Sequence, residues 1–269
     1  GNYIPASTTA NGRVYQWVLP FYDTLTNKLV PQGSYEPLIF LVTPKYQQLY
    51  TLGTDYRIDK NNTLSAEVAM SNYDPNMFSA KDNNTNIGFA AHASCKGKLL
   101  AKNDTTLNNK QSFTYDFNYE FIQNRFNTIE RFRNVEFNRD WNLNVSEKRY
   151  NEHLAVTNLG YMWNGIGTIN YRFKTFIQDS VYRGFENGFN GNVSKHGFNF
   201  LFANSYLHSS STANSSNYFR PKADLFYTST KTKGWKIGVL FDHEINMLKN
   251  RGSDSLTANS YLWQNYKLY

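Results

Sequence analysis

Residues 111–121, QSFTYDFNYEF, limit the possible folds of this chain more than any other stretch. Aromatic residues occupy every second position from Phe113 to Phe121, and the residues between them are polar or charged. Successive side chains of a β-strand point to opposite faces, so the pattern predicts a strand with one aromatic and one polar face. The polar face carries two carboxylates, Asp116 and Glu120, and no aliphatic residue. It therefore either meets bulk water or lines a wet lumen.

The composition supports a sheet whose apolar mass is aromatic rather than aliphatic. Phe, Tyr and Trp number 20, 20 and 5, whereas charged residues make up only 18% and the mean hydropathy is −0.61. A soluble globule usually fills its core with Leu, Ile and Val and covers its surface with Lys and Glu. Aromatic residues combined with uncharged polar ones are typical of transmembrane β-barrels, which have aromatic girdles and a polar lumen.

Alternating and apolar stretches predict roughly a dozen strands and no helix. The expected strands are residues 12–20, 36–43, 47–59, 63–71, 87–102, 111–121, 152–163, 166–177, 180–189, 193–208, 218–229, 235–247 and 260–269. Residues 123–141 predict an irregular segment with strand pairing near residues 134–137.

The predicted connections between strands are of two kinds. Short turns are expected at 60–62, at Asn164-Gly165 and at 230–234, and Asn-Gly is the dipeptide that a type I′ hairpin turn favours. Longer polar loops are expected at 72–86, 209–217 and 248–259, and the Gly- and Asn-rich residues 188–192 are expected to join two further strands.

Strand length favours a membrane-spanning barrel. Ordinary strands average about 5 or 6 residues, whereas a tilted membrane-crossing strand needs about 9 to 11. No apolar run reaches the ~18 residues that a transmembrane helix requires. We therefore expect an all-β fold, an antiparallel transmembrane β-barrel, with residues 1–269 as a single barrel domain or a fragment of a larger barrel.

Several residues are compatible with chemistry, but none has the spacing of a known site. The five histidines, His92, His153, His196, His208 and His243, form no ligand-spaced pair, and the calcium-like spacing of Asp82, Asn84 and Asn86 lacks the required Gly and downstream Glu. A carboxylate pair for glycosidic cleavage would have to come from the polar strand faces. The candidates there are Glu67, Asp116, Glu120, Asp242 and Glu244.

The charged residues form one local cluster and are otherwise dispersed along the chain. Within 123–141 the residues Glu130, Arg131, Arg133, Glu136, Arg139 and Asp140 form the densest charge cluster, which would pair across a lumen or form surface salt bridges. The net charge is +7, but Lys and Arg are dispersed, which favours anionic lipid over nucleic acid. A single cysteine, Cys95, excludes an internal disulfide and is expected to pack on a strand.

Three stretches resemble large outer-membrane β-barrel proteins of Bacteroides-type bacteria (Bacteroidota). They are YTLGTDY at 50–56, LSAEVAMS at 64–71 followed by Asp74, Asn76, Phe78 and Ser79, and RNVEFNRDWN at 133–142. The resemblance covers about half the chain, implies an envelope location and a barrel, and brings no active-site residue with it. The last strand departs from the family pattern, because Asn265 and Lys267 interrupt the apolar alternation on the face of Tyr269.

The sequence thus predicts a non-catalytic protein of the bacterial outer membrane that acts in transport, secretion or an envelope complex. The expected partners are outer-membrane lipid, lipopolysaccharide and other envelope proteins, but not nucleic acid, and no catalytic, metal or cofactor-binding residue is assigned. Two rivals remain. One is a secreted β-sandwich or β-helical module that binds glycan through exposed Tyr and Trp, and the other is a glycan-cleaving enzyme.

Overall fold

The computed structural model describes residues 1–6, 13–38, 42–81, 83–104, 109–143, 148–163, 165–229 and 234–269, with the side chains of residues 100–110 left aside. The chain divides into two compact units, residues 1–44 and 45–269. No helix among these residues is long and apolar enough to cross a membrane.

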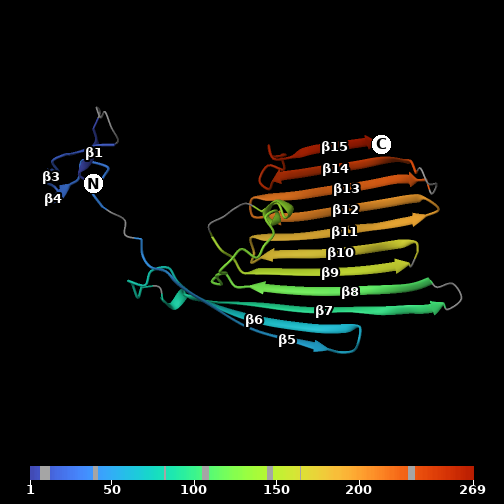
Figure 1. The fold of residues 1–269 in the computed structure, drawn as a ribbon. Helices are drawn as coiled ribbons and strands as arrows, with labels where there is room; N and C mark the ends of the chain where they lie inside the picture. The colour runs from blue at the N-terminus through green and yellow to red at the C-terminus, as the bar shows by residue number, and fades with distance from the viewer. Residues whose placement is uncertain are drawn as a thin grey trace. The chain divides into compact units, whose positions relative to one another are not determined.

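The second unit is built on one antiparallel sheet of eleven strands, each paired with its neighbour in sequence (Figure 1). The strands are β5 (Tyr46–Arg57), β6 (Asn62–Asp74), β7 (Ile87–Asp104), β8 (Asn109–Ile122), β9 (Glu152–Trp163), β10 (Gly167–Gln178), β11 (Tyr182–Lys195), β12 (Phe198–Ser211), β13 (Asn214–Thr228), β14 (Lys236–Asn250) and β15 (Tyr261–Leu268). The predicted all-β class and the antiparallel order are therefore confirmed. Among the described residues the sheet does not close, because β5 and β15 each have one neighbour.

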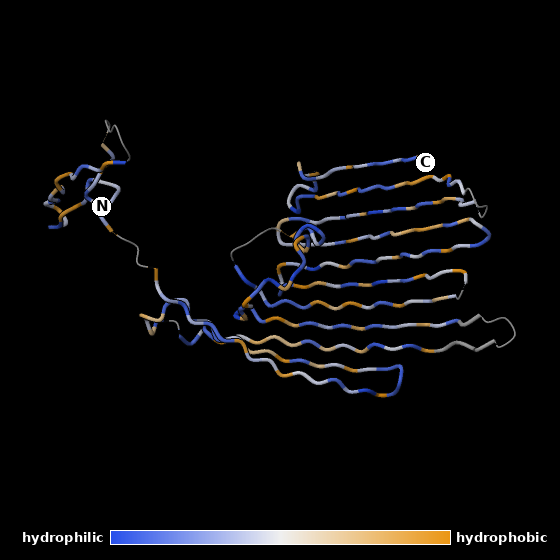
Figure 2. The backbone as a smooth tube through the Cα atoms, viewed as in Figure 1, coloured by the Kyte–Doolittle hydropathy of each residue, from blue (hydrophilic) through white to orange (hydrophobic). Residues whose placement is uncertain are grey.

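The register gives the sheet two chemically different faces. Residues directly opposite each other on paired strands share a face, so the pairs that link Phe117 to Thr157, Thr157 to Phe173 and onward define one side. We call this the apolar face; it carries Phe113, Tyr115, Phe117, Tyr119 and Phe121, as predicted. The opposite, polar face carries Asp116 and Glu120. Figure 2 shows the alternation along the strands.

Most predicted strands have the expected position, and the hairpin at 60–62 is confirmed. Its turn is held by Asp59, whose carboxylate accepts hydrogen bonds from the backbone N–H groups of Asn61 (2.7 Å) and Asn62 (3.0 Å) and from the Asn62 side chain (2.7 Å). The Asn62 side chain and the Asn61 backbone lower the pKa of Asp59 below its ordinary value. A hairpin also joins β9 and β10, with Gly165 at φ +77°; Asn164 lies outside the described residues.

The prediction that residues 188–192 join two strands is wrong. They lie inside β11, and the chain turns instead at His196 (φ +50°) and Gly197 (φ +85°). Gly191 serves close packing rather than a turn, because a Cβ there would lie 2.4 Å from the carbonyl oxygen of Thr168. Two consecutive positive φ angles are what a two-residue type I′ hairpin requires.

Two further connections differ from the prediction. The loop expected at 209–217 is a tight turn, because β12 extends to Ser211 and β13 begins at Asn214. No strand forms at 134–137. The chain there leads into a short helix, α1 (Phe137–Asp140), held by backbone hydrogen bonds from Asp140 to Glu136 and from Trp141 to Phe137. Between β6 and β7 lies one 3₁₀ turn, η1 (Asn83–Thr85).

The first unit is made of short hairpins. It contains β1 (Tyr3–Pro5) paired with β2 (Tyr15–Trp17), and β3 (Phe21–Asp23) paired with β4 (Lys28–Val30). The strands predicted at 12–20 and 36–43 are therefore wrong in extent. Only Tyr15–Trp17 of the first is a strand, which ends before Pro20, and the described residues of the second pair with no other strand. Residues 7–12 and 39–41 lie outside the described residues.

The β11–β12 turn yields a test of the register. Gly197→Ala should lower the free energy of unfolding by about 1–3 kcal/mol, since a Cβ at positive φ would lie 2.8 Å from the carbonyl oxygen of Thr228. Gly188→Ala should cost about 1 kcal/mol or less, because the nearest atoms to its Cβ would be those of the Arg172 side chain, at 3.5 Å or more. Guanidinium titration followed by tryptophan fluorescence measures both. A larger loss for Gly188→Ala would place the turn at 188–192 instead.

Candidate functional site

The connection between β8 and β9, residues 123–151, folds back over the polar face of the sheet. We call it the β8–β9 segment; residues 144–147 are outside the described part. It reaches strands far from its own ends, because Asn142 bonds to Asn246 on β14 and Asp140 pairs with Arg220 on β13. The segment thus spans the polar face from β8 to β14.

An apolar contact anchors the segment. Trp141 is only 2% exposed and packs against Phe176, with ring centroids 5.5 Å apart, while the hydroxyl of Tyr182 donates to the carbonyl oxygen of Trp141. Gly184 lies under the indole, and a Cβ there would approach Trp141 Cε3 to 2.8 Å and the Tyr182 hydroxyl to 2.7 Å. The buried cluster consists of Trp141, Phe176, Tyr182, Leu207 and Tyr218.

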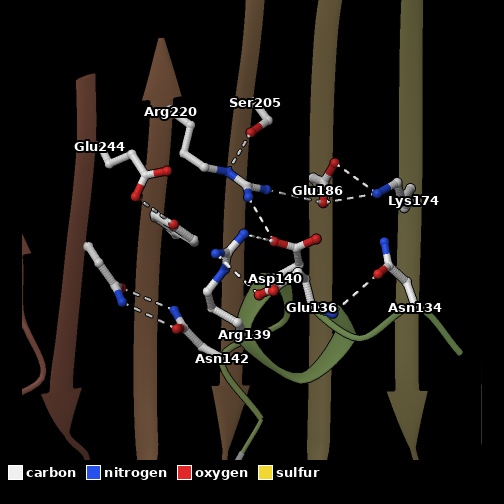
Figure 3. A network of polar contacts seen from close by, with 12 residues as sticks. Asn134, Glu136, Arg139, Asp140, Asn142, Lys174, Glu186, Ser205, Arg220 and Glu244 are labelled. Atoms are coloured by element: carbon white, nitrogen blue, oxygen red, sulfur yellow. Dashed lines mark hydrogen bonds and ion pairs between the residues drawn. The ribbon is translucent and has the colours of Figure 1, made fainter. Parts of the chain in front are cut away.

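Beside the anchor lies a buried carboxylate surrounded by cations (Figure 3). Glu186 is 1% exposed, and Lys174 Nζ lies 3.1 Å from its Oε1 and 3.2 Å from its Oε2. Arg172 Nη2 lies 3.4 Å from Oε1, and Arg220 Nη2 lies 4.0 Å from Oε2. A buried charge is tolerated only when it is paired. Glu186 has three cationic partners, two on the neighbouring strand β10 and one on β13, two strands away on the other side.

Arg220 connects this carboxylate to the segment. Its Nη1 lies 2.9 Å from Asp140 Oδ1, and its Nε donates to Ser205 Oγ at 3.0 Å. Asp140 Oδ1 also lies 3.5 Å from Arg139 Nη2, and Arg139 pairs with Glu136 at 3.2 Å (Figure 3). One continuous chain of opposite charges therefore runs from the sheet into α1.

A second tie lies near the start of the segment. Arg133 Nη2 lies 2.6 Å from Glu120 Oε1 on β8 and 3.0 Å from Glu152 Oε2 on β9. The same guanidinium stacks over the ring of Phe137, 4.6 Å from its centroid. Arg133 thus joins the two strands that the segment connects, and does so against an aromatic surface that favours a cation.

A pair of amides closes the far end. Asn142 Nδ2 donates to Asn246 Oδ1 (3.0 Å), and Asn246 Nδ2 donates back to Asn142 Oδ1 (3.2 Å). Asn142 also donates to the hydroxyl of Ser216. Next to this pair, Glu244 accepts hydrogen bonds from the hydroxyls of Tyr218 (3.2 Å) and Tyr261 (3.1 Å).

The segment has internal order as well. Arg131 donates to three backbone carbonyls of the following turn, those of Arg133 (3.1 Å), Asn134 (3.0 Å) and Val135 (3.0 Å). A cavity of about 370 Å³ remains between segment and sheet. Its lining includes Arg133, Arg149, Glu152 and Gln178.

The predicted charge cluster therefore divides by role. Arg133 and Asp140 pair with the sheet, Arg139 and Glu136 pair with each other, and Arg131 holds its own turn. Glu130 is exposed.

The five candidate carboxylates all lie on the polar face, and most of them have partners. Asp242 pairs with Lys222 at 2.7 Å, Asp116 accepts from Asn118 at 2.6 Å, and Glu120 and Glu244 have the partners given above. Glu67 and Glu120 lie on either side of His92, the residue opposite both of them on β7.

The histidines do not gather. His92 faces the polar side, whereas His153, His208 and His243 lie on the apolar face; His153 bonds to the Tyr119 hydroxyl (2.8 Å) and His243 to the Tyr266 hydroxyl (2.9 Å). Cys95 is half-buried on the apolar face of β7, opposite Phe117. Within the described ranges no three His, Cys, Asp or Glu side chains could together hold a metal ion. Of the calcium-like residues, Asn84 and Asn86 lie in and beside η1, and Asp82 is outside the described residues.

Glu186, Arg220 and Gly184 are among the residues of the site that were not singled out from the sequence. Glu186 is the one carboxylate in a strand of Gly, Asn and Phe, and Arg220 precedes a proline inside β13, so both had a weak signal as charges on predicted polar faces. Gly184 had none, because a glycine in a strand also signals a bulge or a turn. No family model, curated protein or solved structure matches the chain.

Gly184→Ala tests the apolar anchor. The added Cβ should displace Trp141, lower the free energy of unfolding by about 1–3 kcal/mol and shift the tryptophan emission to longer wavelength. Gly188→Ala, four residues along the same face, should leave the emission unchanged. Equal spectra for the two variants would contradict the packing of Trp141 on Gly184.

Asp140→Asn tests the charged connection to the sheet. Loss of the carboxylate leaves Arg220 with the distant Glu186 as its remaining charged partner, so we expect a loss of about 1–3 kcal/mol in the free energy of unfolding. Glu136→Gln is the matched control in the same helix turn; its partner Arg139 is 59% exposed, so the loss should stay within about 0.5 kcal/mol. Denaturant midpoints compare the two, and equal midpoints would contradict a special role for Asp140.

Proposed function

We propose that the eleven-stranded sheet is part of the wall of a bacterial outer-membrane β-barrel. The protein would be non-catalytic and would act in transport, secretion or an envelope complex. Its apolar face would meet lipid and lipopolysaccharide, and its polar face, with the β8–β9 segment, would meet an aqueous lumen. The observation that carries the proposal is the apolar face itself, which is exposed and whose described side chains include no carboxylate between the strand ends.

The exposure of this face is extensive. Large apolar side chains stand at or above 45% exposure on strands across the sheet, for example Val68 at 55%, Phe117 at 45% and Ile237 at 60%. Others of this kind are Leu52, Phe89, Phe189, Phe198, Leu225, Val239, Leu262 and Leu268. Soluble monomers rarely expose contiguous apolar patches larger than a few hundred Å². A face of this size needs an apolar environment.

Charged residues mark the limits of the face. Among the described side chains, Asp74, Arg183, Lys195 and Lys249 are its only Asp, Glu, Lys or Arg residues, and each lies at or next to a strand end. Arg183 and Lys195 are about 12 residues apart on β11, roughly 40 Å at ~3.3 Å per residue. A tilt of ~45° reduces this to roughly 28 Å, close to the ~25 Å apolar band of outer-membrane barrels.

Several polar groups within the face are paired with one another. The Tyr171 hydroxyl donates to Asn187 (2.7 Å), and Asn217 accepts from the Tyr206 hydroxyl (2.8 Å). Such pairing removes the cost of unsatisfied donors and acceptors in an apolar medium.

The alternative fold, a glycan-binding β-sandwich, would require the apolar face to be buried. A sandwich buries one face of each sheet against a second sheet, yet every strand of the second unit belongs to the same sheet in the part of the chain that the structure describes. This favours the barrel over the sandwich.

Heat-modifiable gel migration and extraction only with detergent are the expected behaviour of the native protein. Solubility without detergent would refute the proposal.

A substitution on the apolar face tests its contact with lipid. Phe117→Arg should lower the free energy of unfolding by about 2–4 kcal/mol and reduce the heat-modifiable fraction, because the arginine would enter lipid. Asn118→Arg, the adjacent residue on the polar face, should leave that fraction unchanged. On a water-exposed face both arginines would be tolerated alike.

A further inference from the structure

We infer that the free edges of β5 and β15 are an interaction surface for further β-strands. These added strands are odd in number, run antiparallel to both edges and do not come from a second copy of this sheet. The inference rests on the proposed function, because it is lipid that makes an unpaired edge untenable. In the described residues each edge strand has a partner on one side only.

The direction of the two edges follows from the count of strands. Eleven strands in strictly antiparallel order reverse direction ten times from β5 to β15, so the two edge strands run the same way, as their arrows show in Figure 1. Direct closure of β5 on β15 would therefore create a parallel pair. One strand between them, or any odd number in antiparallel order, makes every pair antiparallel and the total even, as in bacterial outer-membrane barrels.

A second copy cannot supply these strands. Copies that share one orientation in a membrane are related by rotation about the membrane normal, which leaves the direction of every strand unchanged. The β15 strand of one copy would then meet a β5 or β15 strand of the next that runs the same way. The partner is therefore a different β-element with an apolar face toward lipid and a polar face toward the lumen.

The edge strands β5 and β15 lack most of the features that prevent an exposed edge from pairing. Exposed edges in soluble proteins are usually protected by proline, bulges or lysine. Neither β5 (YQQLYTLGTDYR) nor β15 (YLWQNYKL) contains proline, their registers with β6 and β14 have no bulge, and Lys267 is the single lysine of the two. In a bilayer each unpaired backbone group would cost several kcal/mol.

The register identifies the backbone N–H groups of β15 that point to the free edge of the sheet. Gly238 and Tyr269 exchange both backbone hydrogen bonds, at 2.7 and 3.1 Å. Alternate residues of an antiparallel strand bond to the same neighbour. The N–H of Asn265 therefore points to β14, and the N–H of Gln264 points to the free edge.

Proline substitution in the full native protein tests whether the edge of β15 is paired. Gln264→Pro removes an outward N–H and Asn265→Pro an inward one; proline is tolerated on an edge only where the N–H faces solvent. We expect both variants to lose the heat-modifiable form and Gln264→Ala to keep it. Retention by Gln264→Pro would overturn the inference, whereas an unmodified protein that lacks the heat-modifiable form would instead refute the proposed function.

Photo-cross-linking tests the direction of the partner. Benzoylphenylalanine replaces Leu262 or Leu268 on β15, and Tyr50 or Tyr56 on β5, one at a time, and the linked residues are found by mass spectrometry. On each edge the partner residues should appear in reverse order, which shows an antiparallel neighbour on both edges. With the added strands antiparallel to one another, their number is then odd. Links in the same order, between β5 and β15, or to a second copy of either strand would overturn the inference.

Discussion

The alternation of side chains about a single sheet is the constraint on which the rest of this structure depends. Because the period of a strand is two residues, a shift of one residue anywhere in the eleven strands would move aromatic side chains to the charged face and carboxylates to the aromatic face. The registers keep Phe117, Phe173 and Ile245 on one side and Asp116, Arg172 and Glu244 on the other. Both the exposed apolar face and the docked segment exist only because this sorting extends across the whole sheet.

The β8–β9 segment is held by two kinds of contact, aromatic packing and polar or charged pairs, which have different effects. Trp141 on Gly184 supplies burial, which has no direction, whereas the Asp140–Arg220–Glu186 chain and the Asn142–Asn246 pair require one position. Buried ion pairs seldom add much net stability, but a missing partner is costly. The polar contacts therefore set where the segment lies, and the aromatic cluster sets how firmly it is held.

How much could be predicted from sequence depends on how local the determining interactions are. The strand at 111–121 was predictable because its pattern lies in consecutive residues, and the hairpin at 60–62 because Asp59 organises its own turn. The β8–β9 segment was not, because Arg133, Asp140 and Asn142 take partners between 13 and 104 positions away. The glycines of 188–192 misled for a related reason: a glycine needed for close packing against a neighbouring strand reads the same as one needed for a turn.

The Asn142–Asn246 pair has a consequence for the order of folding. Every sheet pairing joins strands that are adjacent in sequence, and most of the connecting loops are short, the β8–β9 segment being the longest connection within the sheet. Such local contacts form quickly. The amide pair joins residues 104 positions apart and has no site to dock on until β14 has been added. Trp141 and Asp140 can dock on β10 to β13 before that step. The amide pair of Asn142 therefore completes the docking of the segment late in assembly, after β14 has joined the sheet.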